Sequence, residues 1–348
     1  MTEPELFDEL QTEEQPELYE HFRVQVDKGQ GLLRIDKYLT SRMESVSRNK
    51  IQAAADAGCI RVNEKQVKSN YRVKGNDVII VLLPHPVREL EILPENIPLE
   101  VVFEDSHVII INKRPGMVVH PGFGNYTGTL QNALLYHFQQ NNDSEALPYL
   151  VHRIDKDTSG LIIVAKNEVA QTKLGKQFFD HSTVRRYLAL VWGDVVDDEG
   201  TITGNLGRSP SNRKVMAVFP DGETGKHAVT HYKVIERFRY VTLVECRLET
   251  GRTHQIRAHF RYIGHPLFAD AQYGGDKILK GTTFSKYKQF VENCFKLINR
   301  QALHAYKFGF VHPENNKFLE FELSPPEDMN AVLEKWRKYS SIGEKYLD

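Results

Sequence analysis

Residues 151–165 of this 348-residue chain read VHRIDKDTSGLIIVA. The polar first part ends at Gly160, and the apolar run that follows is short and rich in β-branched residues, which predicts a buried strand. Asp155 lies in the segment leading into this strand, between Arg153 and Lys156. Because nearby positive charge favours the ionised form of a carboxyl group, we expect Asp155 to be negatively charged at neutral pH. From these residues alone it is a nucleophile, a general base or half of an ordinary ion pair.

A second dense stretch lies further along the chain, where residues 249–259 read ETGRTHQIRAH. Ile256, Phe260 and Ile263 follow the i, i+4, i+7 spacing of one helix face. A helix that packs these three side chains inward directs Arg257 elsewhere. In isolation this is a basic amphipathic helix, and most helices of that kind are merely solvated.

Both stretches resemble motifs of a known family. Residues 152–161 spell His-Arg-Ile-Asp-x-x-Thr-Ser-Gly-Leu, which resembles the central motif of the RluA-type pseudouridine synthases, where the aspartate is the catalytic nucleophile. Residues 249–259 resemble the family's third motif, and residues 118–122 resemble its first. The resemblance implies that Arg257 lies against Asp155. An ion pair of this kind would keep the carboxylate ionised and oriented.

The resemblance also assigns other side chains to the site. Tyr187 matches the family tyrosine that stacks on the target base and can pass a proton, and Leu303 matches an apolar residue that lines the same pocket. Without the resemblance, both would be interpreted as ordinary core residues of strands. The motif residues expected to shape the loop or bind substrate are His152, Arg153, Thr158, Gly160, Arg252, His254 and Gln255.

The implied reaction converts uridine into pseudouridine. The N1–C1′ bond must break, the freed uracil must rotate, and the base must rejoin the sugar through C5. The base first leaves its stack, which costs less free energy in a loop than in a duplex. One ionised aspartate suffices, either as nucleophile at C1′ or as base at C2′, and the sequence leaves both routes open. We therefore expect no metal and no cofactor.

Residues 34–74 predict a small basic domain. They contain ten Lys or Arg side chains against four acidic ones, and the apolar spacing indicates two short helices followed by strands. Residues 34–39 and 58–63 in particular resemble an S4 RNA-binding domain. Such a domain would contact phosphate groups in a largely sequence-independent way. The side chains expected to do so are Arg34, Lys37, Arg48 and Lys50.

Four prolines between residues 84 and 98 indicate an extended linker. We therefore expect an acidic tail at residues 1–30, an S4 domain at 31–83, the linker at 84–98 and a catalytic domain at 99–348. The predicted fold class is α+β. It combines a small α/β S4 domain with a catalytic domain built on a large mixed, mostly antiparallel sheet flanked by helices.

The net charge of −1 hides an asymmetry along the chain. Residues 1–20 hold eight acidic and no basic side chains, which predicts a disordered, solvated tail. The remainder holds 45 basic against 38 acidic side chains, a balance that suits a polyanionic partner such as RNA. Three widely separated cysteines argue against a zinc site and a disulfide framework. No apolar run is long enough to span a membrane, and the acidic N-terminus is the opposite of a signal peptide's basic start, so we expect a cytoplasmic protein. We also expect it to be a monomer.

Other enzyme classes fit the sequence less well. The glycine spacing in residues 122–128 is one residue too long for a kinase loop, and no Gly-x-Ser-x-Gly elbow supports a serine hydrolase. His254 and His259 are five residues apart, so they fall on different helix faces and do not form a metal pair. The resemblance favours large-subunit ribosomal RNA as the substrate. Transfer RNA, or a non-catalytic role in RNA binding or ribosome assembly, remains the alternative.

Overall fold

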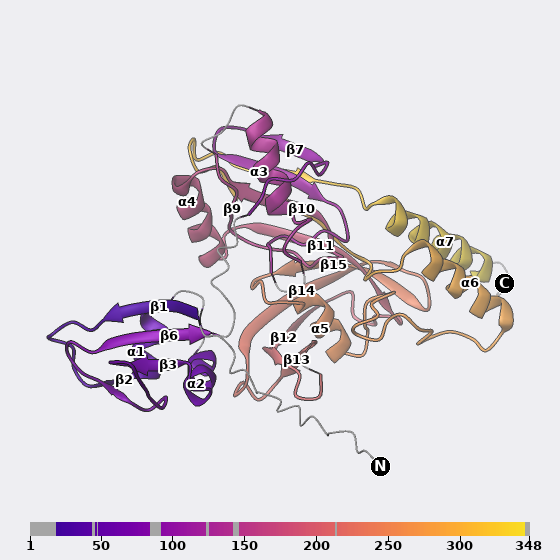
Figure 1. The fold of residues 1–348 in the computed structure, drawn as a ribbon. Helices are drawn as coiled ribbons and strands as arrows, with labels where there is room; N and C mark the ends of the chain where they lie inside the picture. The colour runs from indigo at the N-terminus through magenta and orange to yellow at the C-terminus, as the bar shows by residue number, and fades with distance from the viewer. Residues whose placement is uncertain are drawn as a thin grey trace, which may run out of the picture. The chain divides into compact units, whose positions relative to one another are not determined.

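The computed structural model describes residues 19–43, 46, 48–83, 92–122, 125–141, 146–212 and 214–344. The chain divides into two compact units, Met1–Glu91 and Ile92–Asp348, whose elements are drawn in Figure 1. This division falls within the expected linker, of which residues 84–91 lie outside the described residues. Most of the expected acidic tail, residues 1–18, lies outside them as well.

The N-terminal unit is a small α/β fold with its own apolar core, which includes Ile35, Leu39 and Ile79. Its four-stranded antiparallel sheet has the order β1-β6-β3-β4, and β2 pairs with β5 as a separate ribbon. The strands are β1 (Tyr19–Gln25), β2 (Leu33–Arg34), β3 (Ile60–Val62), β4 (Lys65–Gln66), β5 (Arg72–Val73) and β6 (Val78–Leu83), and the helices are α1 (Ile35–Arg42) and α2 (Arg48–Asp56).

Strand β1 alters the expected N-terminal boundary. It begins at Tyr19 and pairs with β6, so part of the range 1–30 belongs to the folded unit. The reason is local, because Phe22 and Val24 pack against the core of this unit while Arg23 between them is exposed. Alternation of this kind is the pattern of a half-buried strand.

The C-terminal unit is built on one eleven-stranded sheet within the described residues. Along the main path its order is β13-β12-β14-β15-β11-β16-β10-β8-β7, while β17 pairs with β16 and β9 with β10. Only β10 and β16 pair in parallel among these described strands, which confirms a mixed, mostly antiparallel sheet. The bounds are β7 (Val101–Glu104), β8 (Val108–Lys113), β9 (Tyr149–Leu150), β10 (Ser159–Ala165), β11 (Val184–Trp192), β12 (Glu199–Arg208), β13 (Met216–Phe219), β14 (Lys226–Arg237), β15 (Val241–Leu248), β16 (Leu303–Val311) and β17 (Phe318–Glu322).

Strand β10 is buried along its whole length, which explains its unbroken apolar run. Ile162 and Val164 pack with helix α3 (Leu130–Gln140) on one face of the sheet. Leu161 and Ile163 pack with helix α4 (Glu168–Phe179) on the other. With helices on both faces, the successive residues 161–165 of the strand are all apolar, as in a buried central strand.

Three further helices complete the C-terminal unit: α5 (Gln255–Tyr262), α6 (Ser285–Leu297) and α7 (Glu327–Glu344). Helices α6 and α7 lie side by side (Figure 1) and share a core with Trp192 and Phe268. Helix α6 was not predicted from the sequence. Of the helices described, none is long and apolar enough to cross a membrane.

Candidate active site

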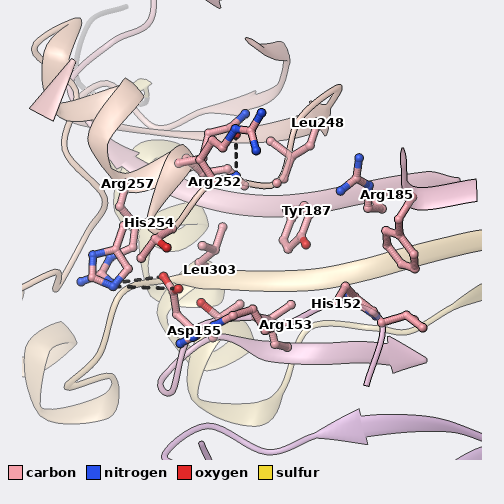
Figure 2. Close-up of a pocket in the computed structure, with 18 of the residues that line it drawn as sticks. His152, Arg153, Asp155, Arg185, Tyr187, Leu248, Arg252, His254, Arg257 and Leu303 are labelled. Carbon is pink, nitrogen blue, oxygen red and sulfur yellow. Dashed lines mark hydrogen bonds and ion pairs between the residues drawn. The ribbon is translucent and has the colours of Figure 1, made fainter. Parts of the chain in front are cut away.

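A cavity of about 570 Å³ lies where the loop before β10, strand β11 and the start of α5 meet (Figure 2). The sheet order explains this meeting, because β16 lies between β10 and β11 and pairs with both. Segments that are far apart in sequence therefore meet at these central strands of the sheet. The predicted site residues that line the cavity are Asp155, Arg257, Tyr187, His152, Arg153, Thr158, Arg252, His254, Gln255 and Leu303.

The side chains of Asp155 and Arg257 form an ion pair in this cavity. Nη1 of Arg257 donates a hydrogen bond to Oδ2 of Asp155 at 3.2 Å. The Asp155 side chain keeps 18% of its surface exposed, whereas Arg257 keeps only 6%. A buried guanidinium beside a partly open carboxylate fixes the orientation of that carboxylate and leaves it accessible to a ligand.

Arg257 is held in place by two further side chains. Its Nε and Nη2 donate to the two carboxylate oxygens of Asp270 at 2.7 and 2.9 Å, and Nη2 also donates to Oε1 of Gln272 at 2.8 Å. Burial disfavours the charge on Arg257, but the hydrogen bonds and charges of Asp270 and Asp155 outweigh it and raise its pKa above the usual value. The guanidinium therefore has a fixed orientation when it meets Asp155.

His254 approaches Asp155 from the start of α5. Its backbone is left-handed, with φ of 53°, and its Nδ1 is 3.0 Å from the hydroxyl of Tyr273. Its Nε2 is 3.9 Å from Oδ1 of Asp155. Burial lowers the pKa of His254, although Asp155 partly opposes this. The ring is thus neutral at neutral pH, and the positive charge beside Asp155 comes from Arg257.

Tyr187 and Leu303 form the apolar part of the cavity. Both are nearly buried and belong to one cluster with Ile154 and Ile256. Burial raises the pKa of Tyr187, so its phenol is neutral at neutral pH. A neutral aromatic ring beside a carboxylate can stack on a flat base.

His152 supports the loop that carries Asp155. Its ring stacks on Phe178 and Phe308, at centroid distances of 4.7 and 5.6 Å, and its Nε2 accepts a hydrogen bond from the backbone N–H of Ile163 at 3.0 Å. Burial, together with the charge of Arg185, lowers its pKa to about 3. His152 is therefore uncharged at neutral pH, and its contacts shape the loop.

Thr158, Gly160 and Gln255 also hold the backbone. The N–H of Thr158 donates to the carbonyl of Asp155 at 3.1 Å and closes the turn. Gly160 lies outside the cavity lining; its φ is +113°, and a Cβ there would lie 2.2 Å from the carbonyl oxygen of Ala305, so only glycine allows β10 and β16 this close approach. The Gln255 amide donates to strand β14 and accepts from the backbone N–H of residue 252.

Known proteins resemble both units of this chain. Residues 107–262 match the family model described as RNA pseudouridylate synthase, and residues 33–79 match the S4 domain. The chain is 48% identical over 318 residues to an uncharacterized RNA pseudouridine synthase of Chlorobaculum parvum, covering 90% of this chain and 96% of that relative. The chain belongs to the RNA pseudouridine synthase family. The resemblance found in the sequence is thereby confirmed for both domains.

Two other relatives extend the comparison. The ribosomal large subunit pseudouridine synthase D of Zymomonas mobilis is 42% identical over 310 residues, covering 86% of this chain and 92% of the relative. The solved structure of human RNA Pseudouridylate Synthase Domain Containing 1 is 25% identical, with a TM-score of 0.51, over 68% of this chain and 87% of that one. Members of the family are isomerases, so this chain is an enzyme that acts on RNA.

The remaining predicted residues lie in exposed positions or in the other unit. Arg153 and Arg252 are exposed at the cavity. In the S4 unit, Arg34 and Arg48 both hydrogen-bond to the buried carboxylate of Asp36. Lys37 is exposed on α1, and the side chain of Lys50 lies outside what the structure describes.

Three supporting residues were not predicted from the sequence. Asp270 and Gln272 orient Arg257, as described above. Lys113, fully buried at the end of β8, donates from Nζ to the backbone carbonyls of residues 114, 117 and 156, each at 2.9 Å. Burial lowers its pKa to about 7, while Asp157 and Asp155 oppose this. In the sequence, Lys113 lies in the stretch NKRPG, which predicts only a strand end followed by a turn.

Proposed function

We propose that this enzyme isomerises specific uridines of large-subunit ribosomal RNA, with Asp155 as its catalytic carboxylate. The observation that carries the proposal is the ion pair between Asp155 and Arg257 in a cavity lined by Tyr187. The Zymomonas mobilis relative is named a ribosomal large subunit pseudouridine synthase, which supports ribosomal RNA as the substrate.

In the proposed reaction, the target nucleotide leaves its stack and enters the cavity. Asp155 acts on the sugar, either by bonding to C1′ or by removing a proton from C2′, and the N1–C1′ bond breaks. Arg257 orients the carboxylate through its hydrogen bond, and Tyr187 stacks on the uracil and can pass a proton. C5 then bonds to C1′, while on the first route the C1′–O bond to Asp155 breaks and on the second Asp155 returns the proton to C2′. The base loses its C5 proton and gains one at N1. Neither route requires a metal or a cofactor.

Binding of the RNA away from the cavity is assigned to the S4 unit. Its basic side chains Arg34, Lys37, Arg48 and Lys50 would contact phosphate groups. Arg153 and Arg252 would do so beside the cavity. We expect the enzyme to act as a monomer. The proposal also keeps the expected cytoplasmic location, where ribosomal RNA is assembled into subunits.

The test is a map of pseudouridines in total cellular RNA from cells with and without the gene. The proposal expects one or a few uridines of large-subunit ribosomal RNA to lose the modification, and a plasmid copy of the gene to restore it. Loss of pseudouridines in transfer RNA alone would identify transfer RNA, and not ribosomal RNA, as the substrate. An unchanged map would point to a non-catalytic RNA-binding role.

A further inference from the structure

Arg185 is a buried cation in the same cavity that the proposed reaction leaves without a role. It lies on β11 two residues before Tyr187, and since side chains alternate along a strand, the two lie on one face. Figure 2 shows Tyr187 between Asp155 at one end of the cavity and Arg185 at the other. Only 8% of Arg185 is exposed.

The partners of Arg185 do not balance its charge. Nη2 donates to the backbone carbonyl of Glu249 at 3.1 Å, and the guanidinium lies 5.5 Å from the ring centroid of Phe178. Nε is buried with no acceptor. No carboxylate of the described residues forms an ion pair with it, and the neighbouring His152 is neutral at neutral pH. A buried charge without a counter-ion is costly unless a ligand supplies the missing acceptor.

Burial lowers the pKa of Arg185, but a guanidinium stays protonated in proteins. The contrast with Arg186, the next residue of the same strand, is direct. Arg186 is 39% exposed and pairs with Glu245 at 2.5 Å. Arg185 therefore differs from its neighbour in having N–H donors that face the cavity rather than an acidic side chain.

We propose that Arg185 stabilises the departing uracil by donating hydrogen bonds to a carbonyl oxygen of its ring. This rests on the proposed function, which places C1′ at Asp155 and the uracil over Tyr187. The edge of the ring that carries the C2 and C4 oxygens then points to the end of the cavity that Arg185 occupies. A preorganised donor aimed at developing charge lowers the barrier of the chemical step more than it strengthens ground-state binding.

The negative charge on the uracil arises when the N1–C1′ bond breaks. Its electron pair leaves with N1 and is shared with the oxygens on C2 and C4, so the uracil departs as an anion. The valence of C1′ is restored either by a C1′–O bond to Asp155 or, after Asp155 takes the C2′ proton, by a C1′–C2′ double bond. Arg185 serves both routes, because the uracil carries the same negative charge in each.

The burial of Arg185 favours the base over a phosphate group as its ligand. A phosphate would have to give up its solvent to reach a side chain that is nine-tenths buried, whereas Arg153 and Arg252 are exposed at the cavity. Cytosine also presents an amino donor where uracil presents the C4 oxygen, so N–H donors at this end would disfavour cytidine.

The test uses the full chain and an RNA whose uridines carry tritium at C5, since tritium is released when C5 bonds to C1′. Arg185→Met removes the donors, and Arg185→Lys keeps a charge without the planar fork. We expect Arg185→Met to lower the single-turnover rate constant about a hundredfold, as loss of one preorganised donor does elsewhere. Arg185→Lys should fall between it and the wild type. The Kd for RNA should stay within about threefold, because ground-state binding is not what Arg185 supplies.

Arg186→Met is the matched control and should keep the wild-type rate constant. An unchanged rate constant in Arg185→Met would overturn the proposal, and so would a loss confined to the Kd, which would indicate a phosphate contact. If Arg185→Met does not fold, Arg185→Lys carries the same test. A wild-type chain that releases no tritium from its mapped RNA would instead contradict the proposed function.

Substrate analogues provide a second readout. Sulfur accepts hydrogen bonds more weakly than oxygen. A 2-thio- or 4-thiouridine at the target position should therefore lower the single-turnover rate constant of the wild type more than that of Arg185→Met, which lacks the contact. The effect of sulfur on the ring itself is common to both enzymes and cancels in the comparison. Equal thio effects in both enzymes at both positions would contradict the contact.

Discussion

At the scale of single residues, the site depends on charges that are each held by a specific partner. Asp155 meets Arg257 at 3.2 Å, and Asp270 fixes Arg257 from behind with two hydrogen bonds. The motifs imply the first pairing although the two residues are far apart in sequence. They give no indication of Asp270, because its position opposite the guanidinium is a consequence of the folded loop rather than of any local pattern.

Asp270→Ala should destabilise the protein. It leaves the buried guanidinium of Arg257 with one carboxylate instead of two, and removing a partner from a buried ion pair costs about 3–5 kcal/mol. Urea denaturation measures the free energy of unfolding. Asp276→Ala is the control, because Asp276 is exposed in the same loop and should change stability by less than about 0.5 kcal/mol. Equal stability of the two variants would show that Asp270 does not anchor Arg257.

His152 predicts a pH dependence of stability. Its folded-state pKa of about 3 lies below its ordinary value of 6.5, so the unfolded chain binds the proton more readily. Its contribution is complete above pH 6.5 and is lost as the pH falls towards 3. His152→Phe should therefore flatten the dependence of the unfolding free energy on pH between 7 and 4, whereas the exposed His227→Phe should not. A variant with an unaltered pH profile would rule out this role.

At the scale of secondary-structure elements, the long strands and most helices of the described residues are predictable from apolar periodicity. The unbroken run of β10 follows from helices on both faces of the sheet. Helix α6 was missed although Tyr287, Val291 and Cys294 have the i, i+4, i+7 spacing, because charged and polar residues fill most of the segment. Strands of two residues, such as β2, are too short for any period and exist only through their partners.

The junction between β8 and the loop of Asp155 gives a prediction at this scale. Lys113→Met removes one hydrogen bond from each of three backbone carbonyls, which should lower the free energy of unfolding by at least about 2 kcal/mol. The rate of isomerisation should fall too, because the carbonyl of Lys156 directly follows Asp155. Lys156→Met keeps that carbonyl and should unfold like the wild type in urea. If both variants match the wild type, Lys113 does not secure this loop.

At the scale of the whole molecule, the proposed function assigns RNA binding to the S4 unit and the chemistry to the C-terminal unit. The prolines predict where the chain divides, and the division between residues 91 and 92 falls in that stretch. The start of the folded unit was less predictable. The eight acids of residues 1–20 suggested a tail, yet strand formation from Tyr19 depends on pairing with β6, which lies far along the sequence.

Removal of residues 1–91 should weaken RNA binding and reduce its dependence on salt. Each lost phosphate contact makes the negative slope of log K against log salt less steep by about one. The C-terminal unit has its own cores and should remain folded. Fluorescence titration at several salt concentrations measures the slope, and circular dichroism checks the fold. An unchanged affinity and slope would contradict a docking role for the S4 unit.

The most direct test of the central claim is the single-turnover rate of pseudouridine formation by Asp155→Asn, measured beside RNA affinity. Asp157→Asn, two residues away, is the control. The account predicts that Asp155→Asn loses on the order of 10⁴-fold or more in rate, as enzymes that lose a nucleophile do, while its Kd for RNA changes less than about threefold. Pseudouridine formation by Asp155→Asn at a rate near that of the control would contradict it.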